Sequence, residues 1–181
     1  MPRAHRHGEV EANFIMHGGI TYLTGGRMVK LPVGRWVLFW AVVPHELVHV
    51  EPDTHMGWAT IPLNWFLHWP VPETVHALVL SGRLIVDTQP ESHDAQTLER
   101  MARDCASDQP VLRQLLAQEI EVRFCRLMLQ NPETLGPTQS RVARVQGMAT
   151  TRQFEKVQRH GCIYCPALPG RIYASNASAL K

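Results

Sequence analysis

Between Glu9 and about Pro90, apolar residues come in short runs that are separated by turn residues. The runs are rich in Val, Ile, Leu, Phe and Trp, which pack well on the faces of a pleated sheet. Gly18-Gly19 and Gly25-Gly26 can adopt the positive φ angles of tight hairpin turns, and Leu31-Pro32-Val33-Gly34 supplies another turn. Short strands at regular spacing are typical of a sandwich or a barrel. The predicted strands cover residues 9–17, 20–24, 27–31, 36–42, 46–51, 55–61, 75–80 and 83–87.

The segment from Pro62 to Pro70 departs from this pattern. Its aromatic residues lie between two prolines, and both a helical turn and an irregular strand are compatible with such a sequence. We interpret the segment as a loop-like element that packs Trp65, Phe66 and Trp69 against the strands.

After Pro90 the apolar period changes from two residues to between three and four. The spacing predicts a helix over 93–106 and a second helix over about 111–130, which Pro110 opens and Asn131-Pro132 ends. The second helix carries a continuous apolar stripe, which either covers the strands, forms a dimer contact or does both. The members of the stripe are Leu112, Leu115, Leu116, Ile120, Phe124, Leu127 and Met128.

The last part of the chain differs from the rest in charge and pattern. Residues 1–136 carry 11 Lys and Arg against 15 Asp and Glu, whereas residues 137–181 carry 7 against 1. We expect a short helix at about 141–159 and low order from residue 160 onward, where Gly, Pro, Ser and Asn predominate. Such a basic tail either contacts nucleic acid or is simply solvated. The predicted parts are therefore 1–90 (strands), 91–136 (a helical hairpin) and 137–181 (the tail).

The composition is that of a globular protein. With 181 residues, 45% apolar and 19% charged, the chain can bury a core without disulfide or metal staples. No apolar run reaches the roughly 18 to 20 residues of a membrane span, and the N-terminus shows no signal-peptide pattern, so we expect a cytoplasmic location. Cys105 and Cys125 stand alone in the predicted helices, and Cys162-Ile-Tyr-Cys165 is one C-x-x-C without a partner motif, for which chance is the favoured explanation.

The candidate chemistry lies near the start of the chain. In His5-Arg-His7, both imidazoles fall on one side of an extended segment, and Glu11 has the same parity. His45 follows a turn proline at the start of a later strand and can join them from across the fold. Three nitrogens and one carboxylate suit one divalent transition metal such as Zn, Fe, Mn or Ni without selecting among them. The same four residues could instead be the polar lining of a pocket for a small organic effector.

Two further residues extend the candidate effector site. Trp36 is one of five tryptophans, and aromatic faces in a barrel often stack on sugar rings, although core packing is the commoner role. His49 lies four residues beyond His45, which puts it on the same face of a regular strand. The candidate effector-binding residues are thus His5, His7, Glu11, Trp36, His45 and His49.

The pattern H-x-H-x3-E, followed after a glycine turn by Pro44-His45, resembles the two cupin motifs. Residues 3 to 135 as a whole resemble the N-terminal domain of AraC-type transcription regulators, particularly the MelR-like branch. This resemblance implies a cupin-like antiparallel β-barrel (a double-stranded β-helix) that binds a small effector such as a sugar, with a helical hairpin that forms a homodimer.

The resemblance also sets expectations about DNA and catalysis. The helix-turn-helix units that follow in such regulators are not recognisable here, although 141–148 resembles the lead-in to the first of them, so DNA is expected as a partner only indirectly, through a full-length relative. No catalytic residues are expected. The alternative is a metal-dependent cupin enzyme, an isomerase or dioxygenase, which needs an open coordination position and a nearby acid or base; Glu9 and His49 are the conceivable groups.

Overall fold

A computed structural model describes residues 4–130, 132–135 and 171–176. Most of the strands precede the two long helices, in agreement with the change of apolar period along the sequence. In chain order the elements are β1 (Val10–His17), β2 (Ile20–Thr24), β3 (Arg27–Lys30), β4 (Trp36–Trp40), β5 (His45–Val50), β6 (His55–Ile61), α1 (Leu63–Phe66), α2 (Glu73–Leu80), β7 (Leu84–Val86), α3 (Asp94–Ala106), α4 (Pro110–Leu129), β8 (Glu133–Leu135) and β9 (Arg171–Asn176).

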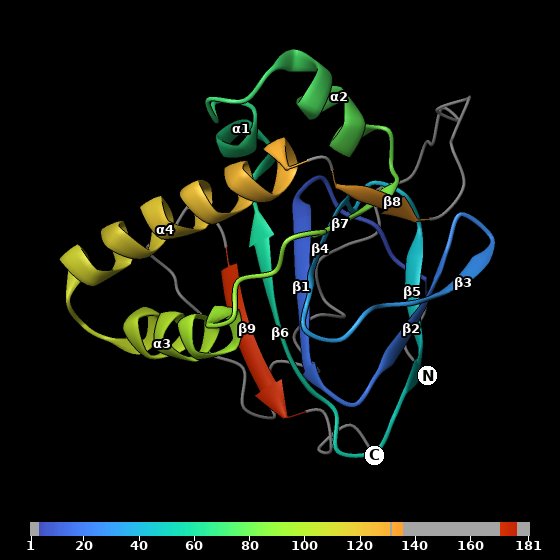
Figure 1. Cartoon of the computed structure of the whole chain (residues 1–181), viewed down its shortest axis with the longest axis horizontal. Helices are drawn as coiled ribbons and strands as arrows, with labels where there is room; N and C mark the ends of the chain where they lie inside the picture. The colour runs from blue at the N-terminus through green and yellow to red at the C-terminus, as the bar shows by residue number, and fades with distance from the viewer. Residues whose placement is uncertain (1–3, 131, 136–170, 177–181) are drawn as a thin grey trace.

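The described strands form two antiparallel sheets rather than a closed barrel (Figure 1). The larger sheet has the order β8-β7-β4-β1-β6-β9, and the smaller sheet has the order β3-β2-β5. Outside these ladders, the pairing in the described part of the chain consists of two isolated bridges, His5 with His45 and Ile15 with Val33. The expectation of a closed barrel is therefore corrected, because single bridges, and not continuous ladders, connect the edges of the small sheet to the rest.

One predicted strand is wrong, while the other seven are confirmed to within two residues at each end. Residues 75–80 belong to the helix α2, which begins directly after Pro72 and carries Glu73 in its first turn. Val75, Leu78 and Val79 pack on the core from positions three and four residues apart, which is the helical period. A short apolar run fits both periods, and the proline and acidic residue before it were the signals for a helix.

The predicted helices and the aromatic segment pack as expected. Helices α3 and α4 begin and end within one residue of the predicted bounds. The aromatic segment forms the short helix α1 rather than a loop, and it does place Phe66 and Trp69 in the core with Trp65 against them. Cys105 and Cys125 are buried in α3 and α4. None of the described helices has both the length and the apolar character that crossing a membrane requires.

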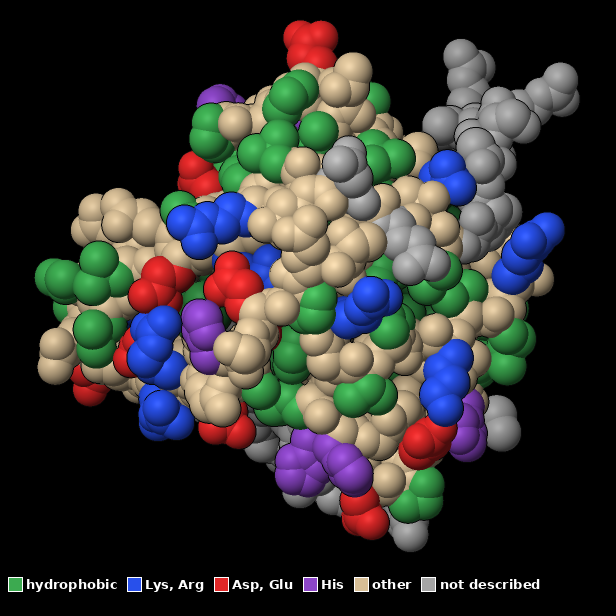
Figure 2. Space-filling view, viewed as in Figure 1, with side chains coloured by type: hydrophobic (Ala, Val, Ile, Leu, Met, Phe, Trp, Pro, Cys, Tyr) green, Lys and Arg blue, Asp and Glu red, His purple; other side chains and the backbone are tan. Residues whose placement is uncertain are grey.

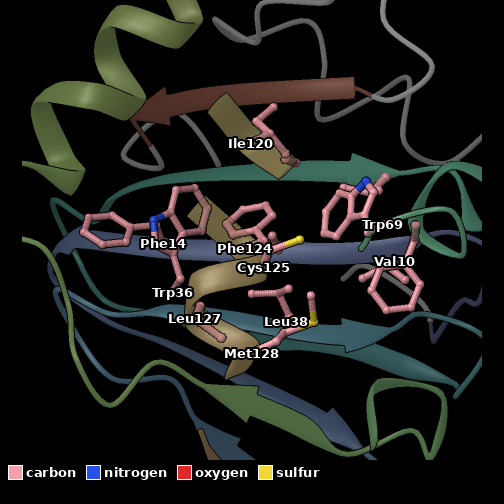
Figure 3. Packing of buried hydrophobic residues seen from close by; sticks show 14 of the residues in the cluster. Val10, Phe14, Trp36, Leu38, Trp69, Ile120, Phe124, Cys125, Leu127 and Met128 are labelled. Atoms are coloured by element: carbon pink, nitrogen blue, oxygen red, sulfur yellow. The ribbon is translucent and has the colours of Figure 1, made fainter. Parts of the chain in front are cut away.

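The larger sheet is covered on both faces, which explains why β1 is buried at six consecutive positions. Alternate residues of β1 point to opposite faces, so Val10 and Phe14 join the core under the helices, whereas Ile15 joins the core between the two sheets. Figure 3 shows Phe124, Leu127 and other residues of α4 packed over the first of these faces. The sheet therefore separates an outer core beneath α1–α4 from an inner core between the sheets.

Close contact between α3 and the sheet depends on Gly57 in β6. A Cβ atom at this position would lie 2.3 Å from the side chain of Leu98 in α3, closer than atoms can approach. The glycine thus allows the helix to lie directly on the strand.

Most of the predicted basic tail lies outside the described residues, including the helix expected at 141–159 and the C-x-x-C. The exception is β9, which pairs with β6 over six residues at the edge of the larger sheet. Low order was expected for this stretch, so the prediction is wrong for Arg171–Asn176. Pairing with an existing edge strand supplies backbone hydrogen bonds that the sequence pattern of a short segment does not reveal.

Candidate functional site

The segment before β1 carries the first two histidines to the start of β5. His5 and His45 exchange two backbone hydrogen bonds, each with an N···O distance of 3.0 Å. The amide of His7 donates to the carbonyl of Ala41, also at 3.0 Å. Because side chains alternate along extended backbone, this pairing places the imidazoles of His5, His7 and His45 on one side.

The predicted ligands come together. The ring centroids of His5 and His45 are 4.3 Å apart, and that of His7 lies 5.7 Å from His45. One ring nitrogen from each histidine lies within 4.8 Å of those of the other two. Oε2 of Glu11, which extends from β1, is 3.3 Å from Nε2 of His45 and 3.9 Å from Nε2 of His7.

Hydrogen bonds on the far side of two rings orient the cluster. Nδ1 of His45 donates to the carbonyl of Val43 at 2.9 Å, and Nδ1 of His7 donates to the carboxylate of Glu9 at 2.8 Å. With the proton on Nδ1, Nε2 of each neutral ring carries a lone pair that faces Glu11 and the neighbouring rings. Metal-binding histidines usually make such a second hydrogen bond, which fixes the tautomer and the ring orientation. The donor set can therefore bind a divalent first-row ion.

Burial and charge act in opposite directions on this cluster. Glu11 and His45 are almost fully buried. Burial raises the pKa of Glu11, but the hydrogen bond and charge of His45 and the charges of His7 and His5 outweigh it, so the pKa is lowered. Burial lowers the pKa of His45, but the hydrogen bond and charge of Glu11 and the carbonyl of Val43 outweigh it and raise the pKa. Glu11 and His45 thus each favour the charged form of the other, and a metal ion bound between them would take the place of the proton on Nε2 of His45.

His49 does not join the cluster. The register between β2 and β5 shifts by one residue, since Thr21 pairs with His49 whereas Tyr22 pairs with Leu47. This β-bulge inserts one extra residue and reverses the alternation, so His49 is exposed while His45 is buried. The prediction from even spacing failed because it assumed a regular strand.

Trp36 lies on the opposite face of the larger sheet from the histidines. Its ring packs on Phe14 and Phe124 in the outer core, and its Nε1 donates to Asp94 at 3.3 Å. Its neighbour Phe39, three residues further along β4, faces inward instead, with its ring centroid 5.0 Å from that of His45. The aromatic side chain against the cluster is therefore Phe39, and Trp36 has a packing role.

Two polar residues beside the cluster were missed. Asn13 has the same parity on β1 as Glu11, and its Oδ1 accepts a hydrogen bond from the hydroxyl of Tyr22 at 3.3 Å. The ring centroid of Tyr22 lies 5.9 Å from that of His45, and burial together with the charge of Glu11 raises the pKa of Tyr22. The signal for Asn13 was available in the sequence, because the parity rule that joined Glu11 to the histidines also joins position 13.

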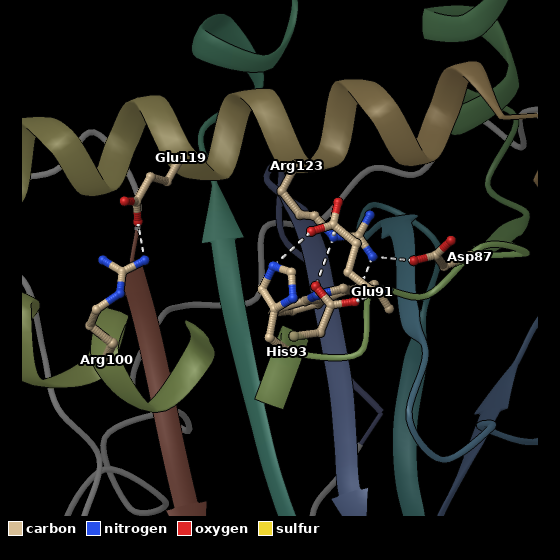
Figure 4. A network of polar contacts seen from close by, with 8 residues as sticks. Asp87, Glu91, His93, Arg100, Glu119 and Arg123 are labelled. Atoms are coloured by element: carbon tan, nitrogen blue, oxygen red, sulfur yellow. Dashed lines mark hydrogen bonds and ion pairs between the residues drawn. The ribbon is translucent and has the colours of Figure 1, made fainter. Parts of the chain in front are cut away.

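A second buried polar cluster, also missed, lies beneath the helices. Arg123 of α4 donates from Nε to Oδ1 of Asp94 at 2.7 Å and from Nη2 to Oδ2 of Asp94 at 2.6 Å, and Nη2 also donates to Asp87. Figure 4 shows Arg123 reaching down from α4 toward Asp87 and Glu91, apart from the more exposed pair of Arg100 and Glu119. The signal was a charged residue inside the apolar stripe of the second helix.

The chain is similar in sequence to bacterial operon regulatory proteins. It is 27% identical over 180 residues to the melibiose operon regulatory protein of Escherichia coli strain K12, and the same identity holds for the protein of that name in strain O6:H1. The predicted resemblance to a MelR-type regulator is confirmed. The alignment covers 99% of this chain and 57% of each relative, so the chain spans little more than half the length of these proteins. No family model matches the chain.

Proposed function

We propose that this chain is the effector-sensing and dimerisation part of a cytoplasmic AraC-type transcription regulator, and that its effector site contains a divalent transition metal. The similarity to operon regulators over 99% of the chain supports the regulatory role. His5, His7, His45 and Glu11 would hold the metal, and a small molecule such as a sugar would be the signal. A metal there would supply a positive charge and coordination positions for ligand oxygens.

The observation that carries this proposal is the convergence of three imidazole rings, with ring nitrogens within 4.8 Å of one another, on the carboxylate of Glu11. Nε2 of His45 and Nε2 of His7 approach Oε2 of Glu11, while their Nδ1 protons are given to Val43 and Glu9. Buried acceptors that face one another are unfavourable unless a proton or a metal ion lies between them. The arrangement thus suits a cation better than it suits a neutral polar pocket wall.

Metal analysis after dialysis tests the proposal directly. The wild-type protein should retain about one equivalent of Zn²⁺, Mn²⁺, Fe²⁺ or Ni²⁺ and should melt roughly 5 to 10 °C higher when the ion is present at 100 times its Kd. His5→Ala and His45→Ala should lose both effects. His49→Ala is the matched control and should keep them, since His49 is exposed and off the cluster.

The outcomes separate the two parts of the proposal. The metal site would be overturned if the dialysed protein holds no metal and if none of the four ions changes its melting temperature. In that case the melting temperature could still rise with melibiose or another sugar, and the rise could be lost in His45→Ala. This result would show that the same residues line a pocket for an organic effector. Absence of both responses would overturn the sensor itself.

The homodimer is proposed to form through the outer face of α4. Leu115, Val122 and Leu129 are spaced seven residues apart and, with Val111, are about half to two-thirds exposed. Figure 2 shows hydrophobic side chains at the left-hand tip of the molecule, where α3 and α4 join. An apolar seam at seven-residue spacing is what a second helix packs against, and a second copy of α4 presents the same seam.

Sedimentation equilibrium tests the dimer. Val122→Glu should weaken self-association at least tenfold, because a charge would be buried at the centre of the seam. Val33→Glu, a valine about 50% exposed on another side of the molecule, should leave association unchanged. A wild-type chain that stays monomeric at about 100 μM, or two variants that behave alike, would contradict this interface.

A metal-dependent enzyme is the alternative function, and the structure gives it less support. Of its two conceivable acid or base groups, the carboxylate of Glu9 is engaged by Nδ1 of His7, and His49 points away from the cluster. The similarity to regulators favours binding over catalysis in the same way.

A further inference from the structure

The inner face of β1 presents a second polar side chain beside the histidine cluster. Asn13 is about 1% exposed, and its Nδ2 has no hydrogen-bond partner among the described residues. Burying an amide group without a partner is unfavourable by an amount comparable to a lost hydrogen bond. The unsatisfied donor therefore needs an explanation, and a bound acceptor would provide one.

Asn13 is held rigidly next to the cluster. It lies in the central strand β1, paired with Val37 of β4 on one side and Trp58 of β6 on the other. The hydroxyl of Tyr22 fixes the amide by donating to Oδ1, which leaves the NH₂ group as the available donor. Alternate residues of a strand are about 7 Å apart, so Glu11 and Asn13 are separated by the length of a small ligand.

Charge indicates what kind of ligand would fit. A divalent ion held by neutral imidazoles and the single carboxylate of Glu11 keeps one net positive charge among its direct ligands, and the half-exposed carboxylate of Glu9 lies beyond the ring of His7, so an anionic ligand on the metal would be favoured. An ion that accepts more than four ligands also has positions left for an exogenous oxygen. A monoanion with oxygen donors would satisfy both conditions.

We propose that the effector carries a carboxylate group, that one oxygen of this group completes the metal at His5, His7, His45 and Glu11, and that Nδ2 of Asn13 donates to the carboxylate. Asn13 is then a specificity-determining residue, and Tyr22 is a positioning residue that acts through it. This inference rests on the metal proposed above and narrows the small molecule to one that bears an anionic oxygen group.

Titration of Co²⁺-loaded protein with acetate tests the inference, with the visible absorption of Co²⁺ as the readout. Acetate should bind the wild type, and acetamide, its uncharged analogue, should bind at least tenfold more weakly. Asn13→Ala should weaken acetate about tenfold, the expected loss of one hydrogen bond to a charged group, while the affinity for Co²⁺ changes less than threefold. Tyr22→Phe, which keeps the amide and the ring, should weaken acetate by a smaller factor and serves if Asn13→Ala folds poorly.

Thr97→Val is the control, because Thr97 is polar and half-buried but lies in α3, beside Trp36 and Phe124 on the other face of the larger sheet, and it should leave the acetate affinity unchanged. Co²⁺ binding with equal acetate affinity in wild type, Asn13→Ala and Tyr22→Phe would overturn this inference alone. Equal binding of acetate and acetamide would do the same. Failure of the wild type to bind Co²⁺ would overturn the proposed metal site and this inference with it.

Discussion

The two faces of the larger sheet each bury a polar cluster, and the two clusters differ in how their hydrogen bonds are matched. On the outer face, Arg123 supplies donors that Asp94 and Asp87 accept. Burial lowers the pKa of Arg123, but the hydrogen bonds and charges of the two aspartates outweigh it and raise the pKa. On the inner face, acceptor atoms of His7, His45 and Glu11 face one another. The first cluster pairs a cation with two carboxylates, whereas the second brings together groups that can bind a cation.

This difference separates a structural role from a binding role. The Arg123 cluster joins three segments, the end of β7, the start of α3 and the middle of α4, and it therefore holds the helical hairpin on the sheet. The histidine cluster joins the N-terminal segment to β1 and β5 through side chains that can also bind a metal ion. Variants at the first cluster should change the stability of the fold, and variants at the second should change ligand affinity.

The largest expected effect is at Arg123. Replacing it with Leu leaves Asp87 and Asp94 buried without their cation, and breaking a buried ion pair in this way costs about 3–5 kcal/mol of unfolding free energy. Urea denaturation measures this loss. Arg100→Ala, which breaks the more exposed ion pairs with Asp104 and Glu119, should cost no more than about 1 kcal/mol. Equal losses in the two variants would remove the contrast between a structural cluster and a surface pair.

The sequence predicted the strands and long helices well, because hydrophobic period reports which face of an element is buried. It failed at residues 75–80, where an apolar run too short to distinguish the two periods forms α2. The closed barrel failed for another reason. Local patterns do not determine which strand edges pair, and within the described part of the chain no continuous ladder joins the small sheet to the larger one.

The site was predictable where regular alternation holds. Because side chains alternate along extended backbone, the odd-numbered positions His5, His7 and Glu11 were predicted to share one face. The same rule would have added Asn13. It failed at His49 because a bulge reverses the alternation in β5. Residue type could not place Trp36 either, since an aromatic residue suits both faces of a sheet that is covered on both sides.

The next effect in size concerns Glu11 and sharpens the contrast with Arg123. Glu11→Gln should lower the affinity for Ni²⁺ or Co²⁺ by at least about tenfold, because the anionic ligand is lost. In the presence of a chelator, however, its unfolding free energy should change by less than about 1 kcal/mol, because His45 can lose its proton and remain buried as a neutral ring once the charge of Glu11 is gone. Calorimetric titration and urea denaturation measure the two quantities. A loss of several kcal/mol without metal would show that the inner cluster is structural like the outer one.

The smallest expected effect is at Glu9, whose carboxylate accepts a hydrogen bond from Nδ1 of His7. Glu9→Gln keeps an acceptor for Nδ1 of His7 but removes the charge that makes the ring a stronger donor to a metal. The affinity for Ni²⁺ should therefore fall by about tenfold, no more than in Glu11→Gln, while the stability without metal stays the same. Glu46→Gln on β5, whose carboxylate is not part of the cluster, is the control and should bind like wild type. If Glu9→Gln also behaves like wild type, the hydrogen bond on Nδ1 of His7 does not tune the site, and the orientation of that ring comes from the backbone pairing with Ala41 alone.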